Sequence, residues 1–123
     1  MRKLTIMSST AVAAAWAFML PVSSHQAAAQ SGQAYVIAAD FEIVAADFNK
    51  YVALAKENAA ASIKDPGCDE FNIAISTKNP NHVYIFEIWK NTAALDAHRA
   101  TDHLKAYLSA TKDMVAKRDI TPM

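Results

Sequence analysis

The chain has 123 residues, with 12 Lys and Arg against 12 Asp and Glu, one Cys and two Gly. A formal charge of zero gives no electrostatic basis for binding nucleic acid or an anionic membrane, because such binding requires clustered Lys and Arg. Two glycines are too few for a glycine-rich phosphate loop. One cysteine excludes an intramolecular disulfide framework and a thiolate zinc site, so a packed core must supply the stability.

Residues 1–29 have the layout of a secretory signal peptide. Arg2 and Lys3 precede an apolar run over 11–20, and small residues at 27–29 form a typical cleavage site. A membrane anchor is the alternative, but a ten-residue helix is only about 15 Å long, half of a bilayer core. We therefore expect cleavage after Ala29 and export to a periplasm or to the medium, with no membrane association afterwards. The 94 residues that remain carry 10 basic and 12 acidic side chains, a net charge of −2.

Residues 30–34 form a polar lead-in, and a single domain over 35–123 follows. Residues 35–43 place apolar side chains at every second position, which predicts a first strand. From 47 to about 64 the apolar spacing changes to three and four, which predicts an amphipathic helix. Its predicted apolar stripe consists of Phe48, Val52, Ala55, Ala59 and Ile63. Pro66 and Gly67 end this helix, because proline disfavours helix in the preceding residue and glycine tolerates a positive φ.

Two further strands are predicted at 68–76 and 82–89, joined by a turn at 78–81. The second of them is apolar on both faces. One face carries Val83, Ile85 and Trp89 beside Glu87, and the other carries Tyr84, Phe86 and Ile88. An antiparallel sheet in a small lone domain normally exposes one face to water. If helices cover one side, a second copy of the chain in a two-fold dimer would cover the other.

Helical segments follow the third strand. Asn91 or Thr92 can cap a helix that begins at Ala93, and Thr101 with Asp102 interrupts it before a second stretch at 103–110. Residues 115–121 can form a short last strand. The resulting order βαββαβ predicts an α+β fold, the ferredoxin-like plait with an antiparallel sheet.

Three motifs, in this order, resemble those of the antibiotic biosynthesis monooxygenase (ABM) family. They are Asp65-Pro66-Gly67-Cys68, the strand YIFEIW at 84–89, and ALDAH at 94–98 followed by His103. The resemblance covers 36–107 and implies a dimeric α+β barrel, in which two plaits pack sheet to sheet. It also implies a range of roles: some members oxidise aromatic polyketides or quinols with dioxygen and no metal or flavin, some relatives bind or degrade haem, and many have no known activity.

Glu87 and His98 are the candidate catalytic residues. Glu87 lies on a mostly apolar strand, where burial raises the pKa of a carboxyl group and so suits it to act as a general base. A salt bridge or a hydrogen bond to backbone near the helix start is the alternative role for Glu87. His98 matches the histidine of the ALDAH motif and could carry a proton or hydrogen-bond a substrate, or instead join the helix to the sheet.

The candidate substrate-binding residues are Trp89, Asn72, Tyr84, Phe86 and His103. Trp89 could instead fill the core, Tyr84 could instead belong to the interface or the core, and Asn72 could simply be exposed. On a continuous helix His98 and His103 would point about 140° apart. A break near Thr101 leaves their geometry open, but no third ligand stands at helical spacing, so no metal site is expected. Cys68 is expected to be buried and inert, and intermolecular pairing of an accessible thiol is the alternative.

Two functions are compatible with these residues. The first is a cofactor-independent monooxygenase that acts on a quinol or another electron-rich aromatic compound: a base removes a phenolic proton, and the anion then reduces dioxygen directly. The alternative is a non-catalytic exported dimer that binds a hydrophobic ring ligand such as haem, with His98 or His103 as the axial ligand. A dimer with a vestigial pocket is a third possibility.

Overall fold

The structure is a computed structural model that describes residues 32–123. The predicted signal peptide lies outside the described residues. Within 32–123, no helix has both the length and the apolar character needed to cross a membrane.

Four strands and three α-helices follow one another in the predicted order. The strands are β1 (Tyr35–Ile43), β2 (Cys68–Ile75), β3 (His82–Trp89) and β4 (Val115–Pro122). A 3₁₀ turn at Ala45–Asp47 leads into α1 (Phe48–Ser62), and α2 (Thr92–Arg99) and α3 (Asp102–Thr111) lie between β3 and β4. The predicted ferredoxin-like α+β fold is confirmed, with its second helical segment divided into two helices.

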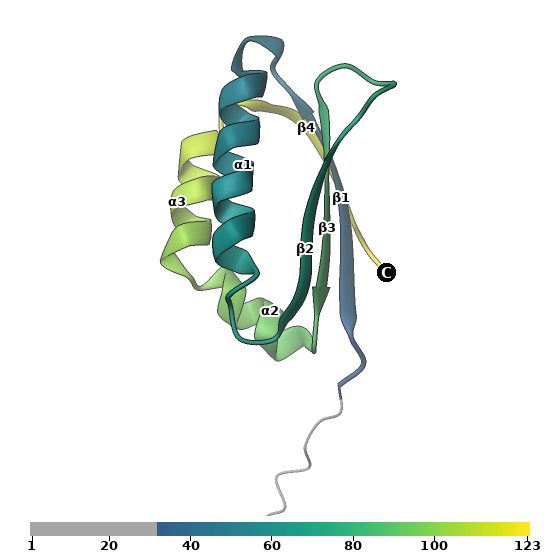
Figure 1. Ribbon diagram of the computed structural model, residues 1–123, viewed down its shortest axis with the longest axis vertical. Helices are drawn as coiled ribbons and strands as arrows, with labels where there is room; N and C mark the ends of the chain where they lie inside the picture. The colour runs from purple at the N-terminus through teal and green to yellow at the C-terminus, as the bar shows by residue number, and fades with distance from the viewer. Residues whose placement is uncertain (1–31) are drawn as a thin grey trace, which may run out of the picture.

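The sheet has the order β2-β3-β1-β4, and all its neighbouring strands are antiparallel. All three helices lie on one side of it (Figure 1). Val83, Ile85 and Trp89 face these helices and are buried, at 0%, 5% and 0% exposure. Phe86 lies on the opposite face and is 37% exposed. The two apolar faces predicted for β3 are therefore present, and in the described part of the chain only one of them is covered by helices.

The buried face of α1 differs from the predicted stripe. It consists of Tyr51, Val52, Ala55, Asn58 and Ser62. Ile63, predicted to be buried, is 46% exposed, because the helix ends at Ser62. The Ser62 hydroxyl donates to the Asn58 carbonyl at 2.7 Å, and a hydrogen-bonded polar group can occupy a buried position that an apolar pattern would not predict.

The division between α2 and α3 is made by side-chain capping. The Asn91 carboxamide oxygen accepts from the Ala94 amide at 2.9 Å and starts α2. Thr101 has an extended backbone, and its hydroxyl accepts from the Leu104 amide at 3.4 Å to start α3. The same hydroxyl donates to the His98 carbonyl at 2.7 Å. His98 and His103 consequently lie on two separate helices.

The turn between α1 and β2 is tied to the start of α2. Gly67 has a φ of +84°, and a Cβ atom there would lie 2.5 Å from the Ala94 Cβ. Its carbonyl accepts from the Lys90 amide at 2.9 Å, and the Asp65 carbonyl accepts from the Cys68 amide at 3.1 Å. This close approach brings Asp65 next to the two C-terminal helices.

Candidate active site

Asp65, His98 and His103 form a cluster of titratable side chains at the meeting point of three elements. One carboxylate oxygen of Asp65, Oδ2, lies 2.7 Å from His98 Nδ1 and 2.9 Å from His103 Nε2. The side chains of Asp65, His98 and His103 are 15%, 3% and 25% exposed, so the cluster is buried on the His98 side and reaches solvent near His103. Asp65 comes from the α1–β2 turn, His98 from the last turn of α2 and His103 from the first turn of α3.

Aromatic rings enclose the buried histidine. The His98 ring lies 4.5 Å from the Trp89 ring, centroid to centroid, at an interplanar angle of 32°. The Phe71 ring lies 5.9 Å away on β2. Trp89 is fully buried, so its ring fills the core and packs against the imidazole, which is the core role considered for it rather than the substrate-binding one.

Glu87 lies beside this enclosure, on the helix-facing side of β3. Its carboxylate oxygen Oε2 accepts from the Trp89 indole N–H at 2.8 Å, instead of from the backbone or a cationic partner. Burial raises the pKa of Glu87, and this rise is partly offset by the indole hydrogen bond and by the charges of His98 and Arg99. The pKa of Glu87 is therefore raised, as its position on a mostly apolar strand led us to expect.

The break at Thr101, which left the relative geometry of His98 and His103 open in the sequence, is present, and it brings the two rings to 5.4 Å between centroids. The missing third group is Asp65, which comes from a turn and therefore has no helical spacing to either histidine. The outer nitrogen of His103, Nδ1, contacts the Asn58 Oδ1 at 2.9 Å.

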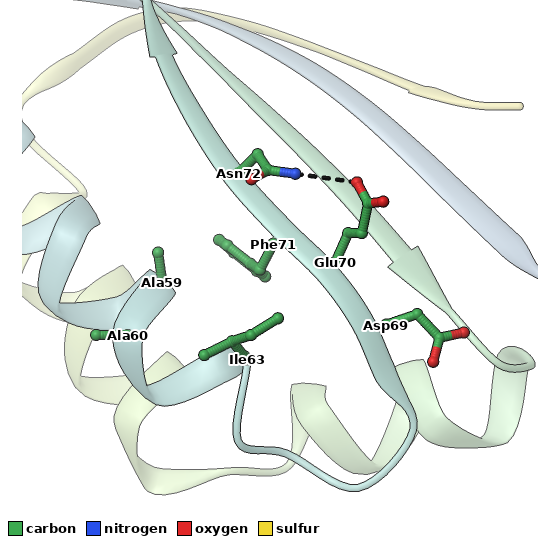
Figure 2. Close-up of a pocket in the computed structure, with 7 residues that line it drawn as sticks. All are labelled: Ala59, Ala60, Ile63, Asp69, Glu70, Phe71 and Asn72. Carbon is green, nitrogen blue, oxygen red and sulfur yellow. Dashed lines mark hydrogen bonds between the residues drawn. The ribbon is translucent and has the colours of Figure 1, made fainter.

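Three other predicted site residues lie outside the cluster of Asp65, His98 and His103. Asn72 is exposed, and its amide donates to Glu70 at 3.1 Å, directed away from the helices (Figure 2). Tyr84 and Phe86 line a shallow hollow of about 320 Å³ on the open face of the sheet. The sheet separates this hollow from His98, so within one chain Tyr84 and Phe86 cannot contact a molecule bound at His98.

A groove of about 500 Å³ lies between α1 and the edge strand β2. Its lining consists of Ala59, Ala60, Ile63, Asp69, Glu70, Phe71 and Asn72. Figure 2 shows Phe71 pointing from β2 toward α1, between the small side chains of that helix and its own strand. Because Phe71 also contacts the His98 ring, this one side chain separates the groove from the buried histidine.

Cys68 is partly exposed, which corrects the expectation of a buried thiol. Its Sγ lies 3.5 Å from the Glu70 carbonyl. Partial burial, together with the negative charges of Glu87, Asp65 and Asp69, raises the pKa of Cys68 to about 11. The thiol is therefore protonated near neutral pH, and the expectation of low reactivity stands on electrostatic grounds.

Asp65, Asn58 and Phe71 were missed as site residues. In the sequence Asp65 appears only as the first residue of the Asp65-Pro66-Gly67-Cys68 motif, with no indication of a site role. Asn58 lies on the buried face of α1, where a polar residue needs a hydrogen-bond partner, but the sequence alone does not show that this face is buried. For Phe71, alternation along β2 correctly indicated the buried face, yet nothing in the sequence indicates contact with His98.

The fold and the cluster together define an α+β plait with a buried histidine between sheet and helices. The sequence pattern described as "Antibiotic biosynthesis monooxygenase" matches residues 34–110, and the chain belongs to this ABM family. Proteins of this family typically form dimers.

Solved structures and one curated protein support the assignment. A candidate antibiotic biosynthesis monooxygenase from Bacteroides thetaiotaomicron is 30% identical, with a TM-score of 0.71 over 74% of this chain and 88% of that one. A protein from Nitrosomonas europaea shares the fold at 22% identity, with a TM-score of 0.72 over 75% of this chain and 89% of that one. An uncharacterized protein from Synechocystis is 27% identical over 82 residues, which are 67% of this chain. The match spans 56% of the length of that relative.

Proposed function

We propose that the protein is a cofactor-independent monooxygenase that acts on a quinol or a similar electron-rich aromatic compound. The observation that carries this proposal is the buried Asp65–His98 pair, held against Trp89 in a chain of the ABM family. Oxidation of such a substrate by dioxygen begins with loss of a phenolic proton, so the enzyme has to supply a positioned base.

His98 is the proposed base, and Asp65 orients it. With a proton on Nδ1 donated to the Asp65 carboxylate at 2.7 Å, the second ring nitrogen, Nε2, is left to accept the phenolic proton. The carboxylate also stabilises the imidazolium that results, which is the role of the acid in other Asp–His pairs. Glu87 supports the arrangement through the indole of Trp89 and does not itself take the proton.

The overall reaction balances without another reactant. The quinol loses a proton to His98, and the phenolate transfers one electron to dioxygen. The resulting radicals combine at a ring carbon to form a peroxide, which loses water. The quinol and dioxygen thus become a hydroxyquinone and water, and the proton returns from His98 to the departing oxygen.

The groove between α1 and β2 is the proposed binding place of the aromatic ring. Ala59, Ile63 and Phe71 supply an apolar floor, and Asn72 with Glu70 supplies hydrogen-bonding groups at the rim. In the described conformation Phe71 lies between the groove and His98. Productive binding therefore requires the Phe71 ring to rotate aside. Because Phe71→Ala removes this ring, it should change KM more than it changes kcat.

The test is dioxygen consumption by the purified protein with a panel of quinols. We expect His98→Ala to lower the rate by a factor of about 100 or more, in the range typical for loss of a general base. His82→Ala is the matched control, because His82 forms an equally short pair with Asp40, 2.8 Å, at the hairpin end of the sheet. Equal rates in wild type and His98→Ala would contradict the proposal, as would a haem absorbance band without any dioxygen uptake.

The same proposal includes a homodimer formed through the open face of the sheet. Tyr84, Phe86 and Ile88 occupy the centre of this face, and the partly exposed Phe86 would be covered by the sheet of a second copy. Sedimentation should give a dimer for the wild type and a monomer for Phe86→Glu. A wild-type monomer at micromolar concentration would contradict this part of the proposal.

Export is proposed on the leader sequence alone. Mass spectrometry of protein recovered from the periplasm or the medium should give a chain that begins at Gln30. Recovery of the intact Met1 form from the cytoplasm would contradict export and would leave the monooxygenase proposal unaffected.

A further inference from the structure

Asp65, His98 and His103 have the composition of a metal centre with two imidazole ligands and one carboxylate ligand. One nitrogen from each histidine and one oxygen of Asp65 lie within 4.8 Å of one another. The carboxylate oxygen is the shared centre of this group, at 2.7 Å and 2.9 Å from the two nitrogens. Three different elements supply the three side chains, so the arrangement is a product of tertiary structure.

The contact between Asn58 and His103 bears on which ring nitrogen of His103 faces Asp65 with a free lone pair. The Asn58 Oδ1 lies 2.9 Å from His103 Nδ1, an arrangement that favours the tautomer with the proton on Nδ1, donated to this oxygen. A neutral imidazole then presents a lone pair at Nε2, which faces the Asp65 carboxylate oxygen at 2.9 Å. In that tautomer two lone pairs face each other at this distance, and a metal ion between them would relieve their repulsion.

The distances suit a metal ion after a small opening of the cluster. Bonds from Zn²⁺ to imidazole nitrogen and carboxylate oxygen are about 2.0–2.2 Å long, which places neighbouring ligands of a tetrahedral site about 3.3 Å apart. The two short oxygen–nitrogen contacts would lengthen by roughly 0.5 Å, and the two histidine nitrogens, which lie within 4.8 Å of each other, would approach to the same spacing by side-chain rotation. Metal-bound histidines also characteristically donate their outer N–H to an oxygen, the role that Asn58 already plays for His103.

We propose that Asp65, His98 and His103 bind a divalent transition-metal ion of the Zn²⁺, Co²⁺ or Ni²⁺ class. Two imidazoles favour such ions over Mg²⁺ and Ca²⁺, which prefer oxygen ligands. A metal ion can reach the cluster from solvent beside His103. This side chain lines a cavity of about 280 Å³ between α1 and α3, together with Asn58 and Tyr107. Three protein ligands leave a fourth position for water or another small ligand.

Metal occupancy and base catalysis are alternative states of the same histidine. A metal ion on His98 Nδ1 moves the ring proton to Nε2, which then donates a hydrogen bond and no longer accepts a proton. This consequence rests on the proposed monooxygenase function, whereas the metal site does not depend on it. Metal binding is therefore measured without substrate, and a negative result there leaves the oxygenase assay to be judged separately.

The experiment is a titration of untagged, chelator-treated full-length protein with Co²⁺, followed by visible absorption. We expect absorption bands of low-symmetry Co²⁺ that saturate at one ion per chain and disappear when Zn²⁺ is added. His103→Ala should weaken binding at least tenfold, and Asp65→Asn should do the same. Asn58→Ala should weaken it by about 10–100-fold, as expected for loss of an outer hydrogen bond.

The control is His82→Ala, which removes a His–Asp pair of the same length that has no third ligand near it in the described residues. It should bind Co²⁺ like the wild type. His103 lies in the first turn of α3 and is 25% exposed, so His103→Ala should fold, and circular dichroism would verify this. Absence of the bands at millimolar Co²⁺, or bands that His103→Ala retains, would overturn the proposal.

Discussion

Replacement of Gly67 by Ala is the sharpest test of how the α1–β2 turn positions the site. Gly67 has a φ of +84°, in the left-handed region, which costs an L-residue about 1–2 kcal/mol. The new Cβ would lie 2.5 Å from the Ala94 Cβ, whereas carbon atoms pack at about 3.5–4.0 Å. Relieving such overpacking costs about 1–3 kcal/mol. The reduced freedom of the unfolded chain offsets less than about 1 kcal/mol.

The expected net loss is therefore about 2–4 kcal/mol in the free energy of unfolding, measured by urea denaturation. Gly32→Ala is the matched control, because Gly32 lies in the exposed lead-in and should change stability by less than about 0.5 kcal/mol. The m-value should stay constant, since neither replacement changes the surface exposed on unfolding.

The contribution of the steric clash to the stability loss of Gly67→Ala can be separated from the φ strain by a double-mutant cycle with Ala94→Gly. Ala94→Gly alone costs about 1 kcal/mol, because glycine weakens a helix. In the double variant the clash is gone and the φ strain remains, so the combined loss should be smaller than the sum by about 1–3 kcal/mol. Additive losses, or a loss below about 1 kcal/mol for Gly67→Ala alone, would refute the reasoning.

Three further predictions concern the ionisable side chains of Glu87, Cys68 and Tyr107. Folding raises the pKa of Glu87 above 4.5, so the wild type loses stability as the pH rises through this window; Glu87→Gln should be the more stable protein at pH 7 and lose that advantage below pH 4 in thermal melts. Alkylation of Cys68 by iodoacetamide should reach half its limiting rate near pH 11, and a midpoint near 8.5 would contradict the raised pKa. Tyr107→Phe removes the hydroxyl that donates to Tyr51 at 2.7 Å and should cost about 1–3 kcal/mol, whereas the double Phe variant should be closer to wild type in urea denaturation.

The fold could be predicted because its signals are local. Alternation over 35–43 and 82–89 reproduces the bounds of β1 and β3, since a strand shows its period within a few residues. The buried face of α1 could not be predicted with the same accuracy. Its polar members, Asn58 and Ser62, are buried because they are hydrogen-bonded, and those partners are a property of the folded chain.

Placement on a face of the sheet was predictable, and placement in the site was not. The period of two correctly put Glu87 and Trp89 on one side of β3 and Tyr84 and Phe86 on the other. It could not show that the helices, and with them His98, cover only the first of these sides. The candidate substrate-binding residues Tyr84 and Phe86 therefore lie on the side of the sheet away from His98.

The break at Thr101 decides what His98 and His103 can do together. On a continuous helix they would point about 140° apart and could share no partner. The Thr101 hydroxyl donates to the His98 carbonyl and accepts from the Leu104 amide, so one side chain ends α2 and begins α3. A capping residue is visible in the sequence, but the angle between two helices is set by how each packs on the sheet and on α1. The shared contact with Asp65, 33 and 38 residues away in sequence, follows only from that packing.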